Sequence, residues 1–167
     1  QKIASSFRSE DLNRAIDMQM SIVTDWQASV SGENRELIVA REVLADYLLQ
    51  AGRFADAKTV ISENAAFKST LYSPTSAEML LVKSQDIFAD AGLADDTLPA
   101  DRLMSLYDDV RAKDIATSVT TASLSNNYIY INDIYGNLFL AAVASNNETM
   151  SFQIAQRMLL SAAGTAV

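Results

Sequence analysis

The segment from Arg41 to Ile61 constrains the fold more than any other part of the chain. Its apolar residues recur every three or four positions on both sides of Gly52, which is the spacing of amphipathic helices. Glycine readily adopts the left-handed backbone that ends a helix, and a second periodic run begins at Phe54. The segment therefore predicts two antiparallel helices joined at a glycine turn, and it favours an all-α fold.

The same helical spacing continues along the rest of the chain. Residues 128–131 alone would suit a strand, but no partner strand appears elsewhere, so we expect a helix there. We predict a single all-α domain over residues 1–167, with about seven helices in antiparallel hairpins. The predicted helices run from Ser9 to Gly32, Glu33 to Ala51, Phe54 to Ala65, Pro74 to Gly92, across Leu103 to Val110, from Tyr128 to Ala144 and from Asn147 to Ala163.

Residues at the helix ends and on the helix faces support these assignments. Ser9 and Asn147 are suited to cap the helices that follow them. Pro74 suits a first helical position, and Thr75 with Glu78 forms an alternative capping box. The spacing also predicts inward-facing residues in the first, second, fifth and last helices: Leu12, Ile16, Met20, Val23; Leu37, Ala40, Leu44, Leu48; Leu103, Leu106, Tyr107, Val110; Ile154, Met158, Leu159.

The hairpin segment also carries a recognisable pattern of large, small and aromatic residues: Leu44-Ala45, Leu48, Gly52-Arg53-Phe54, Ala57 and Ile61. This pattern resembles one repeat of the tetratricopeptide family, over about residues 38–68. The resemblance implies a helical-repeat scaffold that binds other proteins. Arg41 stands where the family usually has an aromatic residue, and Asn64 where it has a small one. The same frame does not fit at other glycines, so a stack of such hairpins and an irregular helical bundle both remain open.

Two missing residue types exclude much of enzymology. The chain has no cysteine, which excludes disulfides, zinc-thiolate sites and thiol nucleophiles. It has no histidine, which removes the usual general base and any Ser-His-Asp triad. The five glycines form no phosphate-binding loop. We therefore expect no enzyme activity and no cofactor.

The acidic side chains form no convincing catalytic or metal site. The pairs at 95–96 and 108–109 are adjacent residues, which point about 100° apart on a helix and do not converge. Glu42 and Asp46 could share one helix face and hold a divalent cation, but no third carboxylate is in register. We interpret these residues as solvated surface groups and predict no metal site.

The net charge of −8 argues against nucleic acid as a partner, because phosphate binding needs a field of Lys and Arg. The apolar run at 128–143 is interrupted by Asn132, Asp133, Gly136 and Asn137, so we expect no membrane span. We expect a soluble domain whose partner is a protein or peptide, with homo- or hetero-oligomers possible.

Charge is unevenly distributed along the chain. Residues 115–167 carry only Asp133, Glu148 and Arg157 of the 34 charged side chains. Charges are depleted both in domain cores and in interface cores, so this segment is either buried or packed on a partner. If the segment is exposed, its tyrosines are the best candidate partner-binding residues, because Tyr is enriched at binding hot spots: Tyr128, Tyr130 and Tyr135.

These features predict a non-enzymatic, helical-repeat-like protein interaction module. The alternative is a structural subunit, or a helical segment of a larger assembly or of a surface or secreted protein, in which residues 115–167 pack on a partner. The chain starts at Gln1, which is consistent with a fragment or a processed product. That start and the missing cysteine slightly favour an extracytoplasmic location, although the sequence does not identify one.

Overall fold

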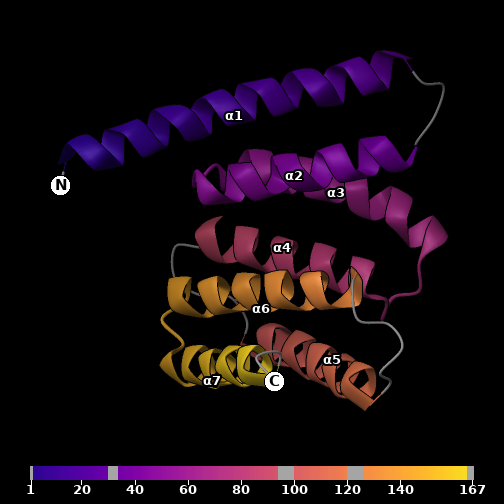
Figure 1. The fold of residues 1–167 in the computed structure, drawn as a ribbon, viewed down its shortest axis with the longest axis vertical. Helices are drawn as coiled ribbons and strands as arrows, with labels where there is room; N and C mark the ends of the chain where they lie inside the picture. Colours follow the sequence, from indigo (N-terminus) through magenta and orange to yellow (C-terminus); the bar gives the residue numbers. More distant parts are fainter. Residues whose placement is uncertain (1, 30–33, 94–99, 120–125, 165–167) are drawn as a thin grey trace. The chain divides into compact units, whose positions relative to one another are not determined.

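All regular secondary structure in the described part of the protein is helical. The computed structural model describes residues 2–29, 34–93, 100–119 and 126–164, and side chains within 10–29, 34–93, 100–113 and 131–159. Seven helices and no strand occur in these residues, so the all-α prediction is confirmed (Figure 1). The helices are α1 (Lys2–Ser29), α2 (Arg35–Gln50), α3 (Phe54–Leu71), α4 (Ala77–Leu93), α5 (Ala100–Val119), α6 (Asn126–Ala144) and α7 (Glu148–Gly164).

The chain divides into two compact units. Unit 1 is Gln1–Leu71 and contains α1, α2 and α3, whereas unit 2 is Tyr72–Val167 and contains α4 to α7. Each unit is described by itself below. The single domain expected over residues 1–167 stays a prediction.

The turn between α2 and α3 has the geometry that the sequence predicts. Gly52 has φ +71°, in the left-handed region that favours glycine. The amide of Arg53 donates to the carbonyl of Leu48 at 2.9 Å, and that of Gly52 donates to the carbonyl of Leu49 at 3.1 Å. These two bonds form a Schellman motif, which satisfies the last carbonyls of α2 and turns the chain back. The predicted helical hairpin is therefore present.

In unit 1, α2 packs against both α1 and α3. The small residues Ala45 and Ala57 are buried in the α2–α3 hairpin, which lets the two helices approach each other closely. On the other side, Ile16 and Val23 of α1 are buried. Met20 was expected to point inward with them, but its side chain is 44% exposed, because α1 packs on only one neighbouring helix and buries a narrow stripe.

Two helices of unit 1 are longer than predicted. α1 begins at Lys2, so Ser9 lies within the helix and does not cap it. Residues 2–8 contain no Gly or Pro that would stop a helix. α3 continues to Leu71, beyond the predicted end at Ala65. Its last turns are held in the helix by Lys68, which is buried and forms an ion pair with α2.

In unit 2, α4 begins later than predicted. Pro74 is not a first helical residue but lies in a turn, in which the amide of Ser76 donates to the carbonyl of Ser73 at 3.0 Å. Ser76 caps the helix instead, because its Oγ accepts a hydrogen bond from the amide of Met79 at 3.2 Å. The capping box predicted at Thr75 is therefore wrong by one residue. The predicted stop at Gly92 is also wrong, since α4 includes it and ends at Leu93.

α6 lies at the centre of unit 2, where it packs against α4, α5 and α7 (Figure 1). This helix contains the apolar run at 128–143. The four inward positions predicted for α5 are all buried. The core of the unit also contains Ile131, Ile134, Leu138, Met150 and Ile154.

The α6–α7 connection is fixed by two asparagines. Asn146 has a φ of 53°, in the left-handed region of the backbone. Asn tolerates this region better than most residues other than Gly. The amide of Asn147 donates to the carbonyl of Ala142 at 2.8 Å, and its Oδ1 accepts from the amide of Met150 at 3.1 Å. Asn147 therefore caps α7 as predicted. Leu159, expected to point inward, is 72% exposed.

Candidate functional site

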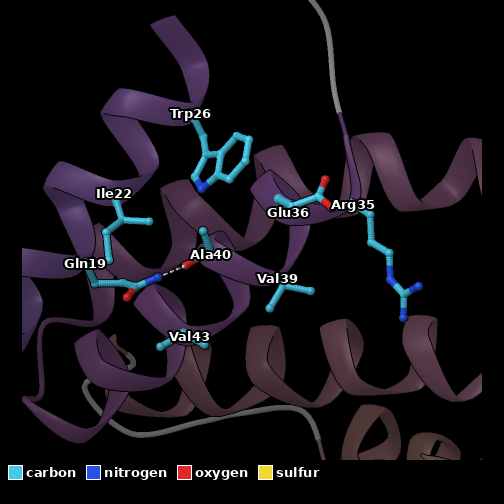
Figure 2. Close-up of a pocket in the computed structure, with 8 residues that line it drawn as sticks. All are labelled: Gln19, Ile22, Trp26, Arg35, Glu36, Val39, Ala40 and Val43. Atoms are coloured by element: carbon cyan, nitrogen blue, oxygen red, sulfur yellow. Dashed lines mark hydrogen bonds between the residues drawn. The ribbon is translucent and has the colours of Figure 1, made fainter. Parts of the chain in front are cut away.

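Among the described residues of unit 1, a surface groove lies between α1 and α2 (Figure 2). Its volume is about 440 Å³, and most of its lining is apolar. We call it the α1–α2 groove. Its lining residues are Gln19, Ile22, Trp26, Arg35, Glu36, Val39, Ala40 and Val43.

The two helices are held at the groove by a hydrogen bond across its floor. Nε2 of Gln19 on α1 donates to the carbonyl of Ala40 on α2 at 2.9 Å (Figure 2). At one end, Asn34 fixes the start of α2, because its Oδ1 accepts from the amide of Leu37 at 2.8 Å. The groove is thus built from two helices with a defined register.

The groove exposes apolar side chains on both of its walls. Ile22 of α1 is 41% exposed and Val39 of α2 is 47% exposed, while Trp26 is half-buried. A smaller hollow of about 210 Å³ adjoins it, lined by Ile22, Trp26, Asp25 and Ser29. The hollowed surface therefore continues along α1 as far as the polar residues Asp25 and Ser29.

The groove contains little that could perform a reaction. Its two charged residues, Arg35 and Glu36, are exposed and lie at the start of α2. In the part of the chain that the structure describes, no three Asp or Glu side chains lie close enough together to hold a metal ion. The arrangement suits the docking of apolar side chains better than chemistry.

A buried polar cluster between α2 and α3 explains two departures from the tetratricopeptide pattern. Lys68 forms an ion pair with Glu42, and both are buried. Arg41 is buried and lies 3.4 Å from the carboxylate of the exposed Glu63. Nδ2 of the buried Asn64 donates to a carbonyl of α2 at 3.3 Å. Glu42, which the sequence analysis considered as a cation ligand together with Asp46, therefore takes part in an internal ion pair.

Unit 2 has a cleft of about 330 Å³ between α4 and α5, and three of its charged lining residues, Lys83, Asp86 and Arg102, form hydrogen bonds or ion pairs within the protein. Arg102 donates hydrogen bonds to Asp86 and Asp90. Burial disfavours the charged guanidinium, yet these bonds outweigh it and raise the pKa of Arg102 above its usual value. Nζ of Lys83 donates to the carbonyl of Pro74 at 2.8 Å. We interpret this cleft as a structural ion-pair cluster.

Of the two acidic pairs considered in the sequence, one lies within the described residues. Asp108 and Asp109 are exposed on α5, as expected, and the pair at 95–96 lies outside the described residues. Partial burial raises the pKa of Asp133 on α6 above its ordinary value. No observation here connects Asp133 with a second titratable group.

The three candidate tyrosines are not brought together on a surface that the structure describes. Tyr135 is fully buried in the core of unit 2, and its ring centroid lies 6.2 Å from that of Tyr107, with the ring planes tilted by 57°. The side chains of Tyr128 and Tyr130 lie outside the described residues. Partner binding by these tyrosines therefore stays a prediction, and Tyr135 has an evident role in core packing.

The sequence did not single out Ile22 and Val39, the exposed apolar residues of the groove walls. Ile22 and Val39 lie off the predicted inward stripes of their helices, and Met18, which is 61% exposed, does as well. The signal that could have found them is this second set of large apolar residues on faces predicted to meet solvent. Their exposure depends on how α1 packs on α2, which helical spacing alone does not specify.

Comparisons with known proteins add no identification, because the chain matches no family model, no curated protein and no solved structure. Among the described residues, no helix combines the length and the apolar character needed to cross a bilayer.

Proposed function

We propose that this protein is a non-enzymatic interaction module that binds a helix or peptide of another protein chain in the α1–α2 groove. One observation carries the proposal: large apolar side chains on two neighbouring helices, Ile22 and Val39, are exposed on opposite walls of one groove beside Trp26. An amphipathic helix commonly binds in such a groove by inserting its apolar residues between two helices. Trp is also enriched among residues that dominate binding energy.

We further propose that the α2–α3 pair is a divergent tetratricopeptide-like hairpin within this module. The turn at Gly52 and the buried small residues Ala45 and Ala57 support this proposal. The polar cluster around Lys68 and Asn64 is a departure from that pattern, and it replaces apolar packing between the helices with ion pairs.

Site-specific photo-cross-linking tests the proposed function. A photoreactive amino acid is placed at Val39, in the groove, and separately at Thr59, an exposed position on α3 outside it. In cells that produce the full chain, we expect protein cross-links from position 39 and few from position 59. Equal cross-linking from both positions, or none from position 39, would contradict docking in the groove.

A second candidate function is a structural subunit that packs on a neighbour through α7. Phe152 is 64% exposed and Leu159 is 72% exposed, and their spacing of seven residues places both on one face of α7. A photoreactive residue at Phe152 tests this candidate in the same experiment. Cross-links from position 152 alone would favour the subunit over the groove.

A further inference from the structure

One face of α1 carries an ordered stripe of exposed charged and apolar residues. Arg14, Met18, Ile22 and Asp25 follow one another at spacings of four, four and three, so they lie on the same side of the helix. All four are exposed, and we call them the α1 stripe. Within the described residues, neither Arg14 nor Asp25 uses its side chain in a hydrogen bond or an ion pair.

The stripe of one copy is complementary to the stripe of a second copy that runs in the opposite direction. Arg14 and Asp25 stand at opposite ends, about 16 Å apart along the helix axis at about 1.5 Å per residue. Met18 and Ile22 lie between them, on either side of residue 20. When two copies of α1 lie antiparallel and centred there, Met18 of each copy faces Ile22 of the other, and Arg14 lies within one residue, about 1.5 Å along the axis, of the position opposite Asp25. A parallel arrangement would instead place like charges opposite each other, which is destabilising.

The stripe is continuous with the α1–α2 groove. Ile22 belongs to both, and Asp25 lines the adjoining hollow. A Met18 side chain from a second copy would therefore enter the groove beside Ile22. Methionine is unbranched and flexible, which suits it to filling an irregular apolar space of this kind.

We propose that the partner bound at this face is a second copy of the chain, with α1 antiparallel to α1 in a symmetric dimer. The inference rests on the proposed function, because it names the occupant of the same groove. A two-fold interface uses the same patch on both copies, which is what a self-complementary stripe provides. An interface of one helix pair and its groove is near the lower size limit for stable complexes, about 1,200 Å² in total. We therefore expect a dimer that dissociates on dilution.

Sedimentation velocity of the full chain over a wide concentration range tests the proposal. We expect monomer at low concentration and dimer at high concentration. Arg14→Asp and Asp25→Arg should each weaken the dimer about tenfold, because each places like charges at both ends of the interface, a difference of roughly 1.4 kcal/mol. The double variant restores opposite charges at both ends, so its dissociation constant should return to within about threefold of the original.

Asp108→Arg is the matched control, because it changes the net charge by the same amount as Asp25→Arg at an exposed position of α5, outside α1. It should leave the dimer intact. Met18→Glu should abolish the dimer while the helical circular dichroism is retained, since Met18 is 61% exposed and not part of the core.

A monomer at every concentration would overturn the proposal, and so would a dimer that the charge reversals do not weaken or that the double variant does not restore. Cross-links from Val39 to a different protein, together with a monomeric chain, would remove the dimer but leave the proposed function standing. An absence of any cross-link from Val39 would remove both.

Discussion

The buried ion pair between Lys68 and Glu42 is the residue-scale feature on which the α2–α3 hairpin most depends. Both side chains are buried from solvent, so each charge is stabilised by its ion-pair partner and not by water. Lys68→Met should lower the free energy of unfolding by about 3 kcal/mol, because it leaves the carboxylate of Glu42 buried without its ion-pair partner. Urea denaturation followed by circular dichroism measures this loss.

The matched control is the double variant Lys68→Met with Glu42→Leu, which removes both charges. It should recover most of the lost stability, because an apolar pair of similar volume often replaces a buried ion pair without cost. A single variant as stable as the original protein would show that Lys68 is not buried as described.

Glycine has opposite roles at two positions of the chain. Gly52 adopts φ +71°, and an added Cβ would meet only the ring of Phe54 at 3.9 Å, so backbone strain alone opposes a side chain there. Gly52→Ala should therefore destabilise the protein by about 1 kcal/mol. Gly136 lies within α6 with open space around the position of a Cβ, so Gly136→Ala should stabilise by about 1 kcal/mol. Thermal unfolding of the two variants should shift in opposite directions, and shifts in the same direction would contradict this assignment.

At the scale of single helices, capping by Asn34 sets the start of α2 and with it one end of the groove. Its Oδ1 accepts the amide proton of Leu37. Asn34→Ala should cost about 1 kcal/mol, whereas Asn34→Asp should retain most of the stability because Asp accepts the same bond. Equal losses in chemical denaturation for both variants would show that the cap contributes little.

The helices could largely be predicted from sequence, because helical spacing and end signals are local. The turn at Gly52 and the cap at Asn147 lie where those signals place them. The predicted helix boundaries are wrong where tertiary contacts or neighbouring turns determine where a helix begins or ends. α3 extends past Ala65 because the buried Lys68 pairs with α2, and α4 starts at Ala77 because Pro74 is used in a preceding turn.

At the scale of the whole molecule, burial accounts for only part of the low charge of residues 115–167. Ile134 and Leu138 are buried in the core of unit 2, whereas Phe152 and Leu159 are largely exposed. Sequence composition could not separate these cases, because it does not say which face of a helix meets a neighbour. For the same reason, the tyrosines drew attention in the sequence, whereas the groove became evident only from the packing of α1 on α2.

The chain contains a single tryptophan, Trp26, and it lines the α1–α2 groove, so its fluorescence reports directly on whether another chain covers this face. The decisive measurement is acrylamide quenching of Trp26 at low and high protein concentration, with Arg14→Asp as the control. We predict that quenching falls and the emission shifts to shorter wavelength as the dimer forms, and that the control variant shows neither change over the same range. Unchanged quenching in a solution that sedimentation shows to be dimeric would mean that the copies meet elsewhere, and would contradict binding in the groove.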